Sequence, residues 1–282
     1  MKKVIALTLA LVFCLALFAG CGQKAENEVT DVPDTENVTD IPNNGDETEP
    51  ALYEQAEGKT YTVGTDTTFA PFEFEDDNGN HTGIDIQLLE GIAEEMGFEV
   101  EWSILGFTAS VTALEAGQVD AMIAGMSITD EREQKYDFSD SYYSTTTGVA
   151  VKADADFDSL EDLRGQTVVA KTGTEGAKYA ESIMDEYELE LIYVDESAIM
   201  YTYVESSQAM ACFEDYPVIQ YEIARGNVGC KVIHQSEAST PYGFAVLRDN
   251  NPELIAAFNE GLKRFKEDGR YDEILNTYFE EN

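Results

Sequence analysis

Apolar residues in the first half of the chain switch between the spacing of a strand and that of a helix. Between residues 84 and 96, apolar side chains recur at intervals of three and four, and Gly97 is placed to end that helix. The strand-like runs are 60–64, 98–104 and 120–124, and a second helical run covers 108–116. This alternation predicts an α/β fold with a largely parallel sheet.

A similar plan is repeated from about residue 147. The strand-like runs are 147–151, 167–170, 189–194, 209–213 and 243–247, and the helical runs are 159–163, 177–184, 198–204 and 218–224. Pro252 opens a long amphipathic helix, and a final helical pattern ends at Phe279. In both halves polar loops follow the carboxyl ends of strands, which is where ligands bind in open α/β sheets.

The N-terminal segment differs from the rest. Two lysines precede an apolar run at 4–18 that is short for a membrane span and leads to Cys21. Because this stretch resembles the lipobox of bacterial lipoproteins, we predict a signal peptide at 1–20 and lipid attachment to Cys21. An ordinary signal peptide or an uncleaved anchor is the alternative. Residues 21–57, rich in Glu, Asp, Asn, Thr and Pro, predict a disordered acidic linker outside the cytoplasmic membrane.

The amino-acid composition argues against several classes of binding partner. The 282 residues carry a formal net charge of -39, which argues against nucleic acid and anionic lipid headgroups because an acidic surface repels both. With His81 and His234 as the only histidines there is no Cys/His cluster, so we expect no metal site and no cofactor. Cys212 and Cys230 lie in apolar stretches, and either a disulfide or two buried thiols fits them.

The sequence Gly125–Arg132, after an apolar run, carries the most suggestive chemistry. Thr129 or Asp130 can cap a short helix there. Free N–H groups at the helix start, the Ser127 hydroxyl and the Arg132 guanidinium would together suit a carboxylate. The alternative is a capped helix whose arginine makes a surface salt bridge, and a short motif alone does not decide between them.

Several motifs in order resemble the polar amino-acid substrate-binding proteins of ABC importers (extracellular solute-binding protein family 3), and glutamine-binding members most closely. They are Thr65–Phe74, Gly83–Asp85, Gly125–Arg132, Tyr136–Ser139 and Asp268–Tyr271, within about Lys59 to Phe279. The resemblance implies a two-lobed periplasmic-binding-protein-like fold with the ligand in the interlobe cleft. Lobe 1 would comprise residues 58–148 and 242–282, and lobe 2 residues 149–241.

The resemblance also implies how the main chain of an amino acid would be held. Arg132 would bind the α-carboxylate, helped by Ser127 and by the backbones of Gly125 and Thr174, and Asp215 would receive the α-ammonium. A zwitterion needs one fixed cation and one fixed anion, which fits these roles. Asp215 can instead be a helix cap.

Aromatic and charged residues would then receive the ligand's side chain. Phe69 and Phe107 would be apolar walls, although both can be ordinary core residues. Asp66 and Lys171 match positions that meet the ligand carboxamide in glutamine-binding members. Binders of basic amino acids share the aspartate but usually lack the lysine, because it would repel a basic side chain.

Two further acidic residues leave a basic amino acid as an alternative ligand. Glu175 and Glu214 depart from the glutamine pattern and place negative charge near the site. We therefore expect a monomeric, non-enzymatic receptor that delivers glutamine to an ABC permease, with arginine, lysine or histidine as the alternative ligand. From another class, an exported cyclohexadienyl-dehydratase-like enzyme on the same fold could use Glu175 or Glu214 as a general acid.

Overall fold

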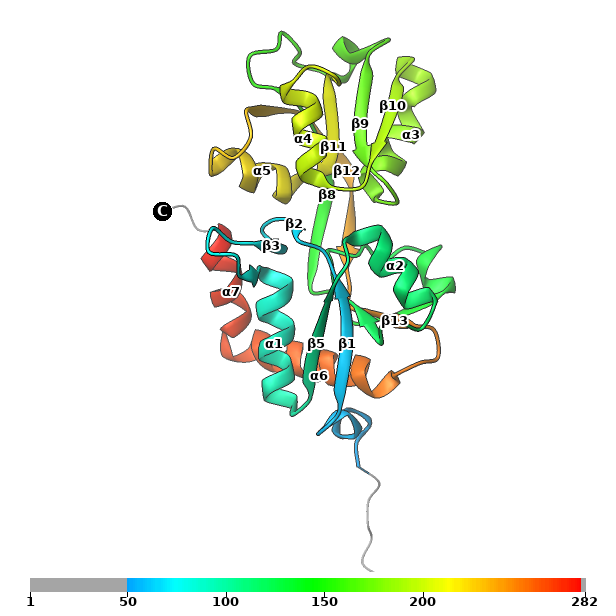
Figure 1. The fold of residues 1–282 in the computed structure, drawn as a ribbon, viewed down its shortest axis with the longest axis vertical. Helices are drawn as coiled ribbons and strands as arrows, with labels where there is room; N and C mark the ends of the chain where they lie inside the picture. The colour runs from blue at the N-terminus through cyan, green and yellow to red at the C-terminus, as the bar shows by residue number, and fades with distance from the viewer. Residues whose placement is uncertain (1–49, 280–282) are drawn as a thin grey trace, which may run out of the picture. The chain divides into compact units, whose positions relative to one another are not determined.

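The computed structural model describes residues 50–279, which form two five-stranded sheets with helices packed on them and a small three-stranded sheet, β2-β3-β4 (Figure 1). The first half contains η1 Leu52–Ala56, β1 Thr60–Thr65, β2 Thr68–Phe69, β3 Glu73–Glu75, β4 His81–Thr82, α1 Ile84–Met96, β5 Glu99–Ile104, α2 Phe107–Glu115, β6 Ala121–Met122, η2 Arg132–Gln134, β7 Tyr136–Phe138 and β8 Tyr143–Lys152. The second half contains η3 Leu160–Leu163, β9 Thr167–Lys171, α3 Glu175–Tyr187, β10 Glu190–Val194, α4 Ser197–Glu205, β11 Ala211–Asp215, α5 Tyr216–Ala224, β12 Cys230–Tyr242, β13 Ala245–Leu247, α6 Pro252–Asp268 and α7 Arg270–Phe279. Within the described residues, no helix combines the length and apolar composition needed to cross a membrane.

Both sheets are mixed. The first has the strand order β5-β1-β6-β13-β7 and the second has the order β10-β9-β11-β8-β12. β13 runs antiparallel to both of its neighbours, and so does β8. The predicted α/β fold is confirmed, but the prediction of a largely parallel sheet is wrong. β8 and β13 arrive directly from the other half of the fold, without the helical crossover that a parallel neighbour requires.

Alternation along the central strands gives each sheet two buried faces. In the second sheet, Val149 and Val151 pack with Ala177 of α3, whereas Ala150 between them packs with Met200 of α4 on the opposite face. The first sheet is covered in the same way, by α1 and α6 on one face and α2 on the other. Because helices cover both faces of each sheet, a ligand can reach the sheets only at the edge where the strands end.

Two long strands connect the sheets. β8 leads from the first sheet into the second and β12 leads back, and they pair from Tyr143 with Tyr242 to Lys152 with Cys230 (Figure 1). The sequence pattern predicted no strand over β12, because its residues are largely half-exposed and its register with β8 is irregular. The predicted lobe boundaries fall within β8 and at the end of β12, and they stay predictions.

The end of the predicted acidic linker is folded. Residues 52–56 form a short 3-10 helix in which Ala56 is fully buried, and Tyr53 packs against the same core. The prediction of disorder is therefore wrong for this part of 21–57, because its few apolar side chains find partners in the core around α6. The predicted signal peptide at 1–20 and Cys21 lie outside the described residues.

Cys212 and Cys230 are buried free thiols. Cys212 on β11 pairs with Ala150, and Cys230 on β12 pairs with Lys152, both on the intervening strand β8. The two cysteines are therefore two strand spacings apart, about 10 Å. This exceeds the roughly 7 Å between Cα atoms that a disulfide can span, so β8 keeps the thiols apart.

We predict that these thiols stay reduced and unreactive in the folded protein. Burial raises the pKa of Cys212 well above its ordinary value and that of Cys230 to about 11. An alkylating reagent should therefore label both residues only after unfolding. Peptide mapping by mass spectrometry measures this directly, and a 212–230 cross-linked peptide in the unreduced protein would contradict the strand geometry.

Candidate functional site

A small and almost filled cavity, with about 10 Å³ of free volume, lies where strand ends from both sheets meet. It is lined by Phe69, Phe107, Ala124, Gly125, Ser127, Arg132, Lys171, Thr174, Glu175 and Asp215. Every predicted ligand residue except Asp66 and Glu214 is on this lining. The structure thus brings together side chains from two halves of the sequence, while their role in ligand contact stays a prediction.

A buried ion pair lies at the cavity. Asp66 follows β1 and Lys171 ends β9, and their side chains, 3% and 2% exposed, are bonded to each other. Burial acts to raise the pKa of Asp66, but the Lys171 ammonium and two backbone N–H groups hold that pKa below its ordinary value. The Lys171 nitrogen lies 5.3 Å from the centre of the Phe69 ring and 5.9 Å from that of Phe107. The two predicted aromatic walls, Phe69 and Phe107, therefore both lie next to the Lys171 ammonium, a cation of the protein itself.

Arg132 is bound to backbone carbonyls on both sides of the cavity. One terminal nitrogen donates to Ser127 O at 2.9 Å, and the other donates to Gly173 O at 3.0 Å. The predicted helix at this point is a three-residue 3-10 turn, with Thr129 Oγ1 accepting from the Arg132 N–H at 3.3 Å. A three-residue turn offers no α-helix N-terminus to an anion, so the guanidinium is the group in this loop whose charge suits one. Two of the five guanidinium N–H donors are used, which leaves others for a carboxylate.

The Gly125 backbone is constrained from two sides. Its N–H donates to Asp85 Oδ2 at 2.8 Å, so this donor is already engaged within the protein, and the predicted help of the Gly125 backbone to a carboxylate stays a prediction. The carbonyl oxygen is the group that Gly125 can still offer, and it suits an ammonium. A side chain here would meet the Phe69 ring at 2.4 Å, and φ is +52°, so the position requires glycine.

Neighbouring acids on β11 have different surroundings. The Glu214 carboxylate accepts from the Ser197 hydroxyl at 2.6 Å and from the Asp215 N–H at 3.0 Å, and it does not line the cavity. Asp215 lines the cavity, and its Oδ2 accepts a short hydrogen bond from the Tyr242 hydroxyl. Alternation along the strand separates the two side chains. Tyr242 was not predicted, because nothing in its sequence context marks the end of a connecting strand.

The start of α3 completes the cavity. Thr174 caps the helix, accepting from the Ala177 N–H at 3.2 Å, and its hydroxyl donates to Lys171 O at 2.8 Å. Glu175 in the first turn forms an ion pair with Lys178 at 3.2 Å. Part of the negative charge of Glu175 is therefore already balanced on its own helix.

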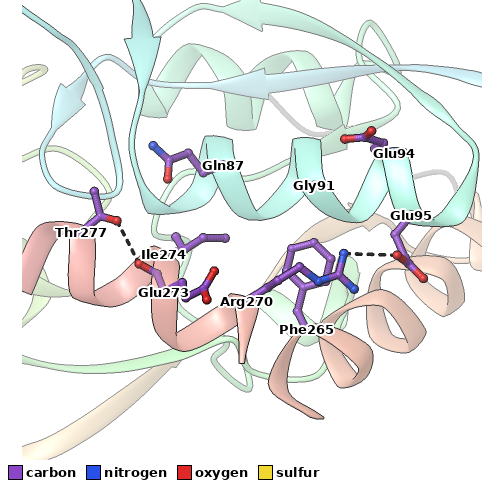
Figure 2. A pocket seen from close by; sticks show the side chains of 9 residues that line it. All are labelled: Gln87, Gly91, Glu94, Glu95, Phe265, Arg270, Glu273, Ile274 and Thr277. Atoms are coloured by element: carbon purple, nitrogen blue, oxygen red, sulfur yellow. Dashed lines mark hydrogen bonds and ion pairs between the residues drawn. The ribbon is translucent and has the colours of Figure 1, made fainter. Parts of the chain in front are cut away.

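A larger open hollow lies between α1 and α7, away from this cavity (Figure 2). Its arginine, Arg270, stacks over the Phe265 ring at 3.9 Å and pairs with Glu95 at 3.2 Å. Glu94 and Glu273 also line it. Because its cation is already paired and the rest of its charge is negative, this hollow lacks the set of cation, anion and apolar walls found in the cavity. In the described residues, no group of three or more potential ligand side chains is arranged for a metal ion.

Comparison with known proteins gives a consistent result. The family described as bacterial extracellular solute-binding proteins, family 3, matches residues 61–281. The chain is 28% identical over 222 residues to the arginine-binding extracellular protein ArtP of Bacillus subtilis (strain 168), covering 78% of this chain and 86% of that protein. It is also 28% identical over 288 residues to the ABC transporter glutamine-binding protein GlnH of the same strain, covering 100% and 99%.

A solved structure is similar over the same region. An ancestral arginine-binding protein bound to arginine is 34% identical, with a TM-score of 0.72, and the match covers 78% of this chain and 98% of that one. The predicted two-lobed arrangement is confirmed by this likeness. The relatives differ in the amino acid that they bind, so the ligand has to be argued from the cavity.

The pKa of Asp215 predicts that ligand affinity depends on pH. Burial, followed by the nearby charge of Glu214, raises the pKa of Asp215 to about 8. Below that pH the free carboxyl carries a proton, which it must release when an ammonium group binds. Affinity for an α-amino acid should therefore rise with pH between about 6.5 and 8, by up to about tenfold per unit.

Titration calorimetry with L-glutamine at several pH values measures this dependence. An Asp215→Asn protein, in which the proton cannot be released, should bind more weakly and with a flatter pH profile. An unchanged affinity of the wild-type protein across this range would show that Asp215 is not the ammonium partner.

Proposed function

Because the chain belongs to family 3 of the bacterial extracellular solute-binding proteins, we propose that its cavity binds one polar amino acid, with glutamine preferred. The protein would then deliver this ligand to an ABC permease. The observation that carries the proposal is the convergence of Arg132, Asp215 and Lys171, which is paired with Asp66 behind it, on one small cavity with aromatic walls. These groups match the chemistry of an amino acid with an amide side chain.

The main-chain groups of the ligand have clear partners. The unused N–H donors of Arg132 suit the α-carboxylate as a planar fork. Asp215 and the carbonyl of Gly125 suit the α-ammonium on the opposite side. Ser127 and Thr174 line the space between them. This division supports an α-amino acid over a simple carboxylic acid, because an acid would leave Asp215 facing an apolar group.

The Asp66–Lys171 pair supports a neutral amide side chain. A carboxamide can donate to Asp66 through its NH2 group and accept from Lys171 through its oxygen. A basic side chain would bring a second cation close to Lys171, which costs about 4 kcal/mol at 4 Å with an effective dielectric constant of 20. Of the two acids that kept a basic ligand open, Glu214 already accepts two hydrogen bonds and Glu175 is paired with Lys178.

Contacts across the cavity support a clamp that opens to admit its ligand. Lys171 bonds to Asp66, Arg132 bonds to Gly173 O, and Lys178 pairs with Glu131 at 2.9 Å. Each contact joins a residue near the first sheet to one near the second. Ligand entry requires that these contacts separate, and ligand binding would favour the closed form by its greater affinity for that form.

We also propose that the protein binds without chemical conversion. Glu214 does not line the cavity and already accepts two hydrogen bonds, and Glu175 is paired with Lys178, which argues against either residue as a general acid toward a ligand. Incubation with arogenate or prephenate should give no aromatic product. Lipid anchoring at Cys21, a monomeric state and lobe boundaries at 148/149 and 241/242 belong to the same proposal.

We predict that Arg132→Ala weakens glutamine binding by about 2–5 kcal/mol, because the α-carboxylate loses its charged partner. The variant should keep the thermal stability of the folded protein, since the arginine bonds only to loop carbonyls. Calorimetry with L-glutamine measures the affinity. Arg164→Ala is a matched control, because Arg164 pairs with Glu161 on the surface. Near-normal affinity of a folded Arg132→Ala protein would overturn the assignment.

We predict that Lys171→Met changes the preferred ligand. Glutamine should bind at least about tenfold more weakly, and arginine or lysine should gain affinity, because the variant leaves Asp66 buried without a cation and a basic ligand supplies one. Competition against L-glutamine measures the change. Lys231→Met, at a surface lysine paired with Asp158, is the matched control. Unchanged preference in Lys171→Met would argue against the ion pair as the selectivity determinant.

A further inference from the structure

One buried tyrosine connects the core of the first sheet to an acid of the second sheet. Tyr242 is the last residue of β12, at the point where the chain returns to the first sheet, and its side chain has 0% exposure. Its hydroxyl donates a short hydrogen bond to Oδ2 of Asp215, the last residue of β11. Asp215 lines the cavity and Tyr242 does not, so the tyrosine hydroxyl can act on a ligand through Asp215.

The ring of Tyr242 is held on several sides. It packs edge-to-face on Phe72 with the ring centres 5.1 Å apart, and the rings of Tyr142 and Tyr143 lie at 6.1 and 5.9 Å. A side chain at Gly125 would meet Tyr242 Cε2 at 3.4 Å, so the ring also lies against the cavity wall. Because these neighbours fix the ring, little side-chain entropy is lost when its hydroxyl bonds to Asp215.

The main chain of Tyr242 is tied to the loop that carries Ser127. Tyr242 and Ser127 form an antiparallel bridge, and next to it the Ile128 N–H donates to Pro241 O at 2.7 Å. The carbonyl oxygen of Tyr242 accepts from the Tyr142 N–H at 3.1 Å. The hydroxyl that reaches Asp215 is therefore carried by a residue that is anchored on the first sheet and its loops.

The two oxygens of Asp215 can then have separate tasks. Because the Tyr242 hydroxyl occupies Oδ2, Oδ1 is the oxygen left for a ligand. Burial, followed by the charges of Glu214 and Glu175, raises the pKa of Asp215 to about 8. The Tyr242 hydroxyl and the Arg132 guanidinium act in the opposite direction, and these four side chains are the principal groups that act on Asp215. A hydroxyl donor stabilises the carboxylate, which is the form that an ammonium group requires.

We propose that Tyr242 is a positioning residue for the α-ammonium group, because its hydroxyl holds Oδ2 of Asp215 and leaves Oδ1 for the ligand. The bond also joins an acid of the second sheet to a residue anchored on the first. Recognition of the ammonium group and the approach of the two sheets would therefore be coupled. The part concerning the ligand rests on the proposed function, whereas the effect of the hydroxyl on the Asp215 carboxyl does not.

The effect on Asp215 is tested without a ligand in Tyr242→Phe, which removes the hydroxyl and keeps the ring. Carbon-13 NMR follows the Asp215 carboxyl against pH, and its resonance is assigned by comparison with Asp215→Asn. The titration midpoint should rise by about one unit, because the carboxylate loses a donor. Tyr61→Phe, which removes a tyrosine hydrogen bond to Glu253 at 3.1 Å, is the matched control and should leave the midpoint unchanged. An unchanged midpoint in Tyr242→Phe would overturn the proposal.

The positioning role is tested by titration calorimetry with L-glutamine and with 4-carbamoylbutanoic acid, the same molecule without its amino group. At pH 6.5, Tyr242→Phe should bind L-glutamine at least about tenfold more weakly than wild type does. The loss should be several-fold smaller at pH 8.5, because more of the variant's Asp215 is then ionised. Ionisation of the ligand itself affects both proteins equally. Affinity for the analogue should change less than about twofold, because it has no ammonium group to position.

The outcomes separate a positioning role from a structural one. Glutamine affinity of Tyr242→Phe within twofold of wild type, an equal loss at both pH values, or an equal loss for both ligands would each overturn the positioning role. If wild type binds the analogue too weakly to measure, the comparison of the two pH values decides. If wild type bound no amino acid, the proposed function would fail, and the carboxyl titration would still decide the effect of Tyr242 on Asp215.

Discussion

The ion pair between Asp66 and Lys171 is the interaction on which the cavity depends. It joins the end of β1 in the first sheet to the end of β9 in the second, and its two side chains are almost fully buried. Leaving one partner of such a pair without the other costs about 3–5 kcal/mol. Any ligand that enters between them must therefore offer both a donor and an acceptor, and this requirement links closure of the fold to the choice of ligand.

Acidic side chains outnumber basic ones around the cavity, and the structure accommodates them in different ways. Asp66 is neutralised by Lys171, whereas Glu175 shares Lys178 with Glu131. The pKa values of Glu214 and Asp215 are raised, above all by burial. The charges of Lys171 on Glu214 and of Arg132 on Asp215 act in the opposite direction and are outweighed by burial.

Much of the fold could be predicted from local patterns. The helical spacing before Gly97 and the left-handed conformation of that glycine agree with the predicted end of α1. β12 could not be predicted, because half-exposed polar residues with an irregular register give no period-two signal. The short helix predicted at Arg132 is only a three-residue 3-10 turn, since a capping residue marks the start of a turn and not its length.

For the candidate site, the sequence predicted which residues come together better than it predicted which of them contact each other. Asp66 and Lys171 were predicted to be ligand residues, but their bond to each other spans 105 positions and depends on how the two sheets approach. Glu214 and Asp215 are adjacent on a strand, so alternation alone implies that they point to opposite faces. Tyr242 gave no signal, because a tyrosine at a strand end is ordinary in sequence.

The most direct test of amino-acid recognition by this cavity is a thermal-shift panel of the common amino acids with the purified protein. A ligand that binds only the folded state raises the melting temperature in proportion to the logarithm of its concentration above the dissociation constant. L-Glutamine should give the largest shift, with little or no shift from arginine, lysine or histidine. A panel in which no amino acid stabilises the protein, or in which arginine stabilises it most, would contradict the assignment.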